Sequence, residues 1–167
     1  PIALPSIPKV SAVLLSELKL ENPDLKKVNQ VISTDPALTA RVLQLANSGF
    51  FKMSGKVSSA SEALALLKLQ HVRAMVQDAA SSSSIKTVPG VELHPFWDYS
   101  LNVARLSRSL AGVVRQNQGA AFTCGLIHAI GELAIHLGMP EKAALLDRQY
   151  SPLSLKRARA ERKLLGF

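Results

Sequence analysis

Three side chains that can bind a metal ion recur at four-residue spacing in the second half of the sequence. His128, Glu132 and His136 would lie near one face of a helix, and imidazole and carboxylate groups are common ligands of divalent cations. Each step of four residues rotates by about 40°, so the two histidines diverge by about 80° around the helix axis. Because a further ligand would have to come from another element, the spacing alone does not predict a metal site.

The single cysteine, Cys124, precedes His128 by one helical turn, which would permit a nucleophilic thiol beside an imidazole base. Its apolar neighbours Phe122, Leu126 and Ile127 predict instead a buried packing cysteine with little reactive thiolate. One cysteine cannot form an internal disulfide, which agrees with a reducing compartment. No glycine-rich phosphate loop or Ser-His-Asp arrangement accompanies these residues, so the common catalytic constellations lack support.

The composition favours an all-α protein. Of the 167 residues, 47% are hydrophobic but only 5% are aromatic, and the abundant leucine and alanine favour helices over strands. A chain of this length can bury one sizeable core, which predicts a single domain built as a compact multi-helix bundle. The longest apolar runs stop well short of the about 20 residues that a membrane span needs, and no export signal is evident. We therefore expect a cytoplasmic protein that has no membrane as partner.

Cap residues mark where several helices begin. Asp35 followed by Pro36 predicts a helix start, because aspartate accepts hydrogen bonds from the first-turn N–H groups and proline has no N–H to satisfy. Ser59 and Glu62 have the spacing of a capping box. The predicted helices cover residues 8–18, 25–32, 36–48, 60–68, 71–83, 96–117, 120–137, 140–148 and 153–165.

One internal boundary divides the predicted helices into two halves. The stretch between Ser81 and Pro95 holds four serines, then Pro89 and Gly90, with little apolar periodicity. We therefore expect an N-terminal helical half at residues 1–85 and a second helical half at residues 95–167, packed together in one domain.

Several motifs, taken in order, resemble one known family. They are Leu4-Pro5-Ser6-Ile7-Pro8, Thr34-Asp35-Pro36-Ala37-Leu38-Thr39-Ala40-Arg41-Val42-Leu43, Leu45-Ala46-Asn47-Ser48, Lys56-Val57-Ser58-Ser59-Ala60, Glu62-Ala63-Leu64, Phe96-Trp97, and Ala121-Phe122 up to Gly131. In this order they resemble the HDOD domain of bacterial signalling proteins, over nearly the whole chain. The resemblance implies that the second half is similar to the core of HD phosphohydrolases.

The resemblance also implies where a metal site would be and which ligands it lacks. In the HD core, a histidine on one helix and a His-Asp pair on another hold divalent metal, which activates a water molecule. Here the pair reads His128-Ala129, and Tyr99 stands where related domains often place a histidine. A hydrolytic metal needs about three protein ligands, and these positions offer one. The resemblance thus implies a vestigial HD site, with no metal, no cofactor and no hydrolase activity, and with His128 left inside a helix interface.

Two aromatic segments are candidates for an interaction surface. Phe50, Phe51 and Lys52 place aromatic side chains beside a basic group in a predicted loop; the alternative is that one phenylalanine simply caps the core. Trp97, beside Phe96 at the start of a long helix, either packs the joint between the halves or anchors a partner.

Much of the positive charge lies near the C-terminal end. The chain has a formal net charge of +8, and residues 142–167 carry seven basic and two acidic side chains. Arg157 and Arg159 are therefore further candidates for an interaction surface. Exposed basic helix faces are commonly just solvated, and no aromatic interleaving or recognition motif accompanies the charge, so nucleic acid is not an expected partner.

The resemblance and the missing ligands together predict a non-enzymatic signal-transduction domain that acts by binding other signalling proteins. The alternative is a degenerate HD phosphohydrolase, or a sensor that binds a nucleotide or cyclic dinucleotide in the vestigial pocket near Tyr99 and His128.

Overall fold

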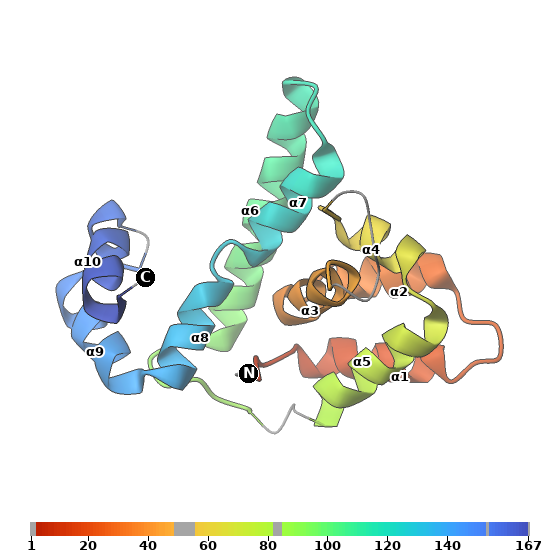
Figure 1. The fold of residues 1–167 in the computed structure, drawn as a ribbon, viewed down its shortest axis with the longest axis horizontal. Coiled ribbons are helices and arrows are strands. Elements are labelled where there is room, and N and C mark those ends of the chain that lie inside the picture. Colours follow the sequence, from red (N-terminus) through yellow and green to blue (C-terminus); the bar gives the residue numbers. More distant parts are fainter. Residues whose placement is uncertain (1–2, 49–55, 82–84, 153, 167) are drawn as a thin grey trace.

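The computed structural model describes residues 3–48, 56–81, 85–152 and 154–166, and within these ranges it confirms an all-α fold (Figure 1). An isolated antiparallel bridge joins Val88 to Val91. The helices are α1 (Pro8–Leu18), α2 (Leu25–Ile32), α3 (Pro36–Ala46), α4 (Ala60–Leu66), α5 (Leu69–Ser81), α6 (Leu93–Val113), α7 (Gln118–Ile127), α8 (Ile130–Gly138), α9 (Pro140–Gln149) and α10 (Leu155–Leu165).

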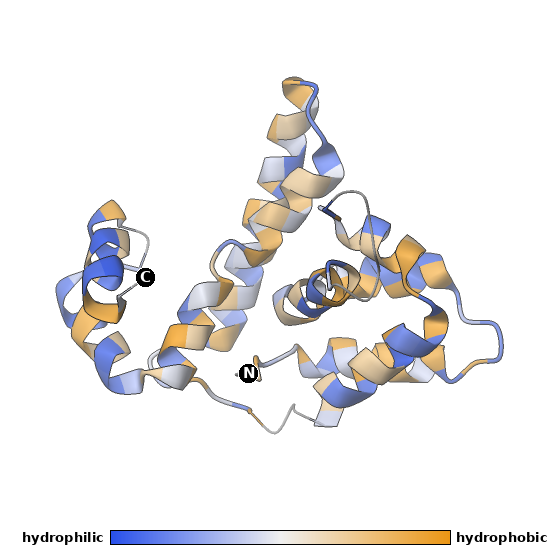
Figure 2. Ribbon diagram, viewed as in Figure 1, coloured by the Kyte–Doolittle hydropathy of each residue, from blue (hydrophilic) through white to orange (hydrophobic). Residues whose placement is uncertain are grey.

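The first five helices enclose a hydrophobic core. In this half α1 packs against α5 and α2, and α3 packs against α4, with their apolar faces in the shared core. Hydrophobic and hydrophilic residues are interleaved along these helices (Figure 2). Apolar residues at helical spacing supply these faces, and burying them is the main favourable contribution to folding. The fully buried members of this core include Leu14, Ile32, Leu38, Val42 and Val76.

The predicted cap residues are confirmed as helix starts. Asp35 precedes α3, and its Oδ1 accepts a hydrogen bond from the backbone N–H of Leu38 at 3.0 Å. Ser59 precedes α4, and its Oγ accepts from the backbone N–H of Glu62 at 3.2 Å. The carboxylate of Glu62 in turn accepts from the N–H of Ser58 at 3.0 Å. These starts depend on local geometry alone, which is why the sequence predicts them.

The carboxyl of Asp35 is fully buried, and this burial raises its pKa to about 6, although hydrogen bonds from the backbone N–H groups of Leu38 and Ile7 oppose the rise. In the unfolded chain the ordinary pKa is 3.8. Between these values the folded state binds a proton that the unfolded state does not, so stability falls as pH rises through this window. We expect Asp35 to remove up to about 3 kcal/mol of stability between pH 4 and pH 6.

Urea unfolding of wild type and Asp35→Asn across this pH range checks the expectation. The amide keeps a good helix cap but cannot titrate. The free energy of unfolding should therefore fall more steeply with pH in wild type than in Asp35→Asn, and parallel curves would contradict the raised pKa.

A long hairpin of α6 and α7 forms the centre of the second half (Figure 1). The two helices approach closely at Gly125, where an added Cβ would lie 2.8 Å from Cα of Ala104 and 2.8 Å from Oγ of Ser107. The absence of a side chain at position 125 is therefore what allows this crossing distance.

Substituting Gly125 by alanine is expected to destabilise the fold by roughly 1 to 3 kcal/mol, because the methyl group would overlap the backbone of α6. Gly131→Ala is the matched control, since no heavy atom lies within 4 Å of a Cβ added at that position of α8. The control should be neutral or slightly stabilising. Chemical unfolding of the two variants distinguishes these cases, and equal stability would show that the helices do not depend on Gly125.

The sequence prediction of one continuous helix over residues 120–137 is wrong. The segment forms α7 and α8, which meet at a turn formed by His128 and Ala129. Neither residue is a strong helix breaker, so local propensity gives no sign of this turn. After this turn α8 leads on to α9 and α10.

By length and composition alone, Gln118–Gly138 is apolar enough to cross a membrane, with a mean hydropathy of 1.4. The expectation from the uninterrupted apolar runs, that no such segment is present, does not hold for this stretch. In the fold its first part packs along α6 and its two helices are separated by a turn. A composition of this kind is also typical of helices that lie in the core of a folded domain.

Candidate functional site

The structure brings together two of the three predicted vestigial residues. Tyr99 lies on α6 and His128 at the C-terminal end of α7, and their rings meet with centroids 5.5 Å apart and planes inclined by 57°. Nδ1 of His128 lies 2.7 Å from the backbone oxygen of Gly125. A carbonyl oxygen only accepts, so Nδ1 carries the proton and Nε2 is the nitrogen left for a ligand.

Ala129 completes this position in the turn between α7 and α8. A methyl group cannot coordinate a cation, and the neighbouring Tyr99 supplies a phenol where an imidazole ligand would be expected. Among the residues that the structure describes, no group of three or more His, Cys, Asp and Glu side chains is placed to hold a metal ion. The residues around His128 therefore do not fit the divalent metal of an HD core.

The expectation that His128 lies inside a helix interface is wrong. The side chain is exposed at the C-cap position of α7, where the backbone still has helical dihedrals. Cys124 is also exposed, contrary to its predicted burial. The buried residues of α7 are Thr123, Gly125 and Leu126, and Cys124 points away from them.

The spaced residues His128, Glu132 and His136 do not converge on one site. His136 is buried, with Nδ1 2.8 Å from the backbone oxygen of Glu132 and Nε2 3.0 Å from Oδ2 of Asp147. The contact with Asp147 joins α8 to α9. The helix is interrupted at Ala129, between His128 and the two α8 residues, so the regular helical spacing on which a shared face depends is lost.

Arg157, predicted on an interaction surface, is instead 1% exposed. Its Nη1 donates to Oδ1 of Asp147 at 2.7 Å, its Nη2 to Oε2 of Glu132 at 2.8 Å, and its Nε to Oε1 of Glu161 at 2.8 Å. Burial raises the pKa of the Glu132 carboxyl, and Arg157 offsets only part of this rise. Three carboxylates thus hold the guanidinium inside and join α8, α9 and α10.

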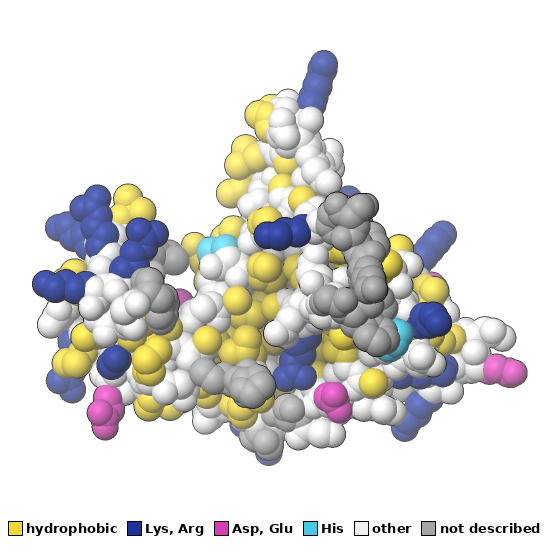
Figure 3. Space-filling model, in the orientation of Figure 1, with side chains coloured by type: hydrophobic (Ala, Val, Ile, Leu, Met, Phe, Trp, Pro, Cys, Tyr) yellow, Lys and Arg dark blue, Asp and Glu magenta, His cyan; other side chains and the backbone are white. Residues whose placement is uncertain are grey.

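The other residues predicted for an interaction surface differ in their exposure. Trp97 is 8% exposed and its ring packs edge-on against His94, with centroids 5.4 Å apart, so it is not an accessible anchor. Phe50, Phe51 and Lys52 lie outside the described residues. Arg159 is exposed on α10, where Lys and Arg side chains gather over α9 and α10 (Figure 3).

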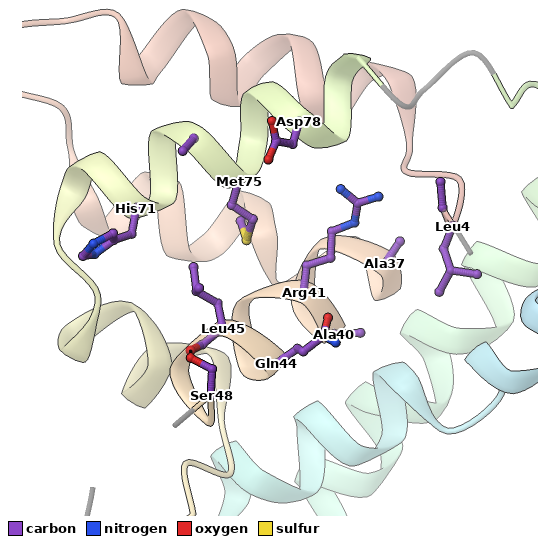
Figure 4. A pocket seen from close by; sticks show the side chains of 12 residues that line it. Leu4, Ala37, Ala40, Arg41, Gln44, Leu45, Ser48, His71, Met75 and Asp78 are labelled. Atoms are coloured by element: carbon purple, nitrogen blue, oxygen red, sulfur yellow. Dashed lines mark hydrogen bonds between the residues drawn. The ribbon is translucent and has the colours of Figure 1, made fainter. Parts of the chain in front are cut away.

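A groove of about 870 Å³ that was not predicted from the sequence lies between α3, α5 and the N-terminal segment. Figure 4 shows it running from Leu4 at one end to His71 and Ser48 at the other. Ala40 and Met75 contribute to its apolar lining. The half-buried side chain of Arg41 extends from α3 toward α5 (Figure 4). The lining residues come from segments about thirty positions apart, so no local pattern in the sequence reveals the groove.

Comparisons with solved structures show the same fold. The chain is similar to the crystal structure of the MmoQ response regulator from Methylococcus capsulatus strain Bath, with 29% identity and a TM-score of 0.79 over 96% of this chain and 65% of that chain. A virulence factor from Campylobacter jejuni subsp. jejuni shares the fold at 20% identity, with a TM-score of 0.68 over 98% of this chain and 60% of that chain.

Curated relatives are much longer than this chain. An uncharacterized protein from Treponema pallidum strain Nichols is 26% identical over 81% of this chain, and the matched part is 27% of that protein. The uncharacterized protein YuxH from Bacillus subtilis strain 168 is 28% identical over 65% of this chain and 26% of its own length. The chain thus spans about a quarter of the curated relatives that it matches.

The family assignment rests on nearly the whole sequence. The HDOD domain family model matches residues 4–167, a range that includes every helix from α1 to α10. The chain therefore belongs to the HDOD domain family.

Proposed function

We propose that this chain is a non-catalytic regulatory domain that acts in cytoplasmic signal transduction by binding other signalling proteins. The observation that carries the proposal is the composition of the vestigial site. Ala129 offers a methyl group beside His128, whose Nε2 is the one histidine nitrogen left for a ligand there. A single imidazole neither holds a hydrolytic metal nor activates a water molecule.

Similarity to a protein named as a response regulator supports the signalling context. The match to MmoQ covers 96% of this chain at 29% identity. A domain without a metal centre contributes to such a pathway by binding, because binding that differs between two states of a partner is sufficient to pass on a signal.

The groove between α3 and α5 is the surface we assign to protein binding. Its volume of about 870 Å³ and the length of α3 along one wall suit a short amphipathic helix or peptide. Apolar contacts with residues such as Met75 would provide affinity, and Met adapts its shape to different side chains. Arg41 and Asp78 both line the groove, so a partner segment that carries both an acidic and a basic residue would complement it.

Ala40→Trp tests this assignment, because the indole would fill the groove. A partner identified with the full-length protein in its native host, and then purified, is expected to bind this variant at least about tenfold more weakly. Ala144→Trp, at an exposed position of α9, is the matched control and should bind like wild type. Unchanged binding by Ala40→Trp, in a variant that circular dichroism shows to be folded, would refute the assignment of this groove.

A further inference from the structure

A second groove lies at the junction between the two helical halves. It has a volume of about 330 Å³ and is lined by residues of α2 and α4 from the first half and of α6 and α7 from the second. The halves also touch nearby, where the backbone N–H of Ala60 donates to Oγ1 of Thr123 at 3.4 Å. A ligand in this junction groove would therefore contact both halves at once.

Two arginines give the junction groove its charge. Arg105 and Arg108 line it from α6, and no aspartate or glutamate is among its described lining residues. Neither guanidinium forms an ion pair in the part of the chain that the structure describes. The whole stretch of residues 99–131 contains three arginines and no acidic residue. An anion in the groove would thus meet two cations with no competing carboxylate beside them.

The rest of the lining suits a polar ligand that carries a planar ring. Asn29 and Gln30 offer amide groups, and Phe122 offers an aromatic side chain. The Asn29 amide donates to Oγ of Ser61 at 2.9 Å, while its buried Oδ1 has no hydrogen-bond partner within the described residues. A buried acceptor left unsatisfied beside a polar groove is typically paired with a water molecule or a ligand group.

The first turn of α7 adds to the preference for an anion. Gly119 lines the groove from this turn, and the N-terminal end of a helix carries partial positive charge on its backbone N–H groups. Asn117 caps the helix by accepting from the N–H of Ala120 at 3.0 Å. This contribution supplements the two arginines, which provide full charges able to form paired hydrogen bonds with phosphate oxygens.

We infer that the junction groove binds a nucleotide, with its phosphate between Arg105 and Arg108 and its base toward Phe122 and the amides of Asn29 and Gln30. The volume of about 330 Å³ lies at the small end of ligand pockets, which favours a mononucleotide over a larger ligand. This site is separate from the protein-binding groove between α3 and α5 and from the vestigial position at Tyr99 and His128.

Calorimetric titration of the full chain with AMP, adenosine and inorganic phosphate tests the inference. AMP is expected to bind and to raise the melting temperature, as any ligand of the folded state does. Adenosine and phosphate should each bind at least about tenfold more weakly than AMP, because each lacks one part of the recognised structure. The double variant Arg105→Ala/Arg108→Ala should lose at least about tenfold in AMP affinity.

Arg148→Ala/Arg159→Ala is the charge-matched control, since both arginines are exposed and neither lines the groove. It should bind AMP like wild type. Absence of AMP binding at millimolar concentration, or equal loss in both double variants, would overturn the inference.

Phosphate that binds as tightly as AMP would overturn it as well and would leave the groove as an anion site. An oligonucleotide that binds where AMP does not would instead make the groove a nucleic-acid surface. No partner protein enters these titrations, so their failure would leave the proposed protein-binding function untouched.

Discussion

Replacing Arg157 by methionine is expected to lower the free energy of unfolding by about 3 kcal/mol. The guanidinium is 1% exposed and donates to the carboxylates of Asp147, Glu132 and Glu161. Removing one member of a buried ionic cluster leaves the remaining charges uncompensated. The three carboxylates are 20% to 32% exposed, so water can partly solvate them, which keeps the expected loss at the lower end for buried ion pairs.

The matched control is Arg159→Met, the same substitution on the same helix at an exposed position. Its effect should stay within about 0.5 kcal/mol, as is usual for surface changes. Urea unfolding of both variants, monitored by circular dichroism, gives the comparison. If Arg157→Met proved as stable as Arg159→Met, the cluster would not be what holds α10 against α8 and α9.

Asp35→Ala is expected to destabilise the N-terminal half by about 2 to 4 kcal/mol. Oδ1 of Asp35 accepts from the N–H of Leu38 at 3.0 Å, and Oδ2 accepts from the N–H of Ile7 at 2.6 Å. Alanine removes the cap of α3 and leaves both N–H groups without their acceptor in a site that water does not reach. The second bond also fixes the segment that precedes α1, so the change affects two elements together.

Asp24→Ala provides the control for Asp35→Ala, because Asp24 also caps a helix but is exposed, and it accepts from the N–H groups of Lys26 and Lys27. Water can replace an exposed cap, so a loss of only about 0.5 to 1 kcal/mol is expected. Thermal and urea unfolding of the two variants measures the difference. Similar losses in both would mean that burial of Asp35 adds nothing to an ordinary cap.

Sequence alone could predict the parts of this fold that depend on neighbouring residues. The start of α3 at Pro36 and the start of α4 after Ser59 follow from cap chemistry within four residues. Composition predicted the all-α class, and the family resemblance placed Tyr99 and His128 at one position, where their rings do meet. Spacing along the chain carried no information about that contact.

The sequence predictions that the structure contradicts concern residues whose neighbours come from distant parts of the chain. Arg157 belongs to a run of basic residues, and only Glu161 among its partners lies within one helical turn. Glu132 on α8 and Asp147 on α9 reach it from 25 and 10 residues away in the sequence. Both grooves are likewise formed between helices that are remote in sequence.

Metal content measured together with turnover shows whether the position around His128 supports metal-dependent hydrolysis. The full chain would be loaded with Mn²⁺, Fe²⁺ or Zn²⁺ under reducing conditions, desalted, assayed for bound metal by mass spectrometry and incubated with a phosphodiester substrate. We predict substoichiometric metal and no cleavage above the buffer rate. Stoichiometric metal together with phosphodiester cleavage, both lost in His128→Ala, would instead show that this position is a working metal centre.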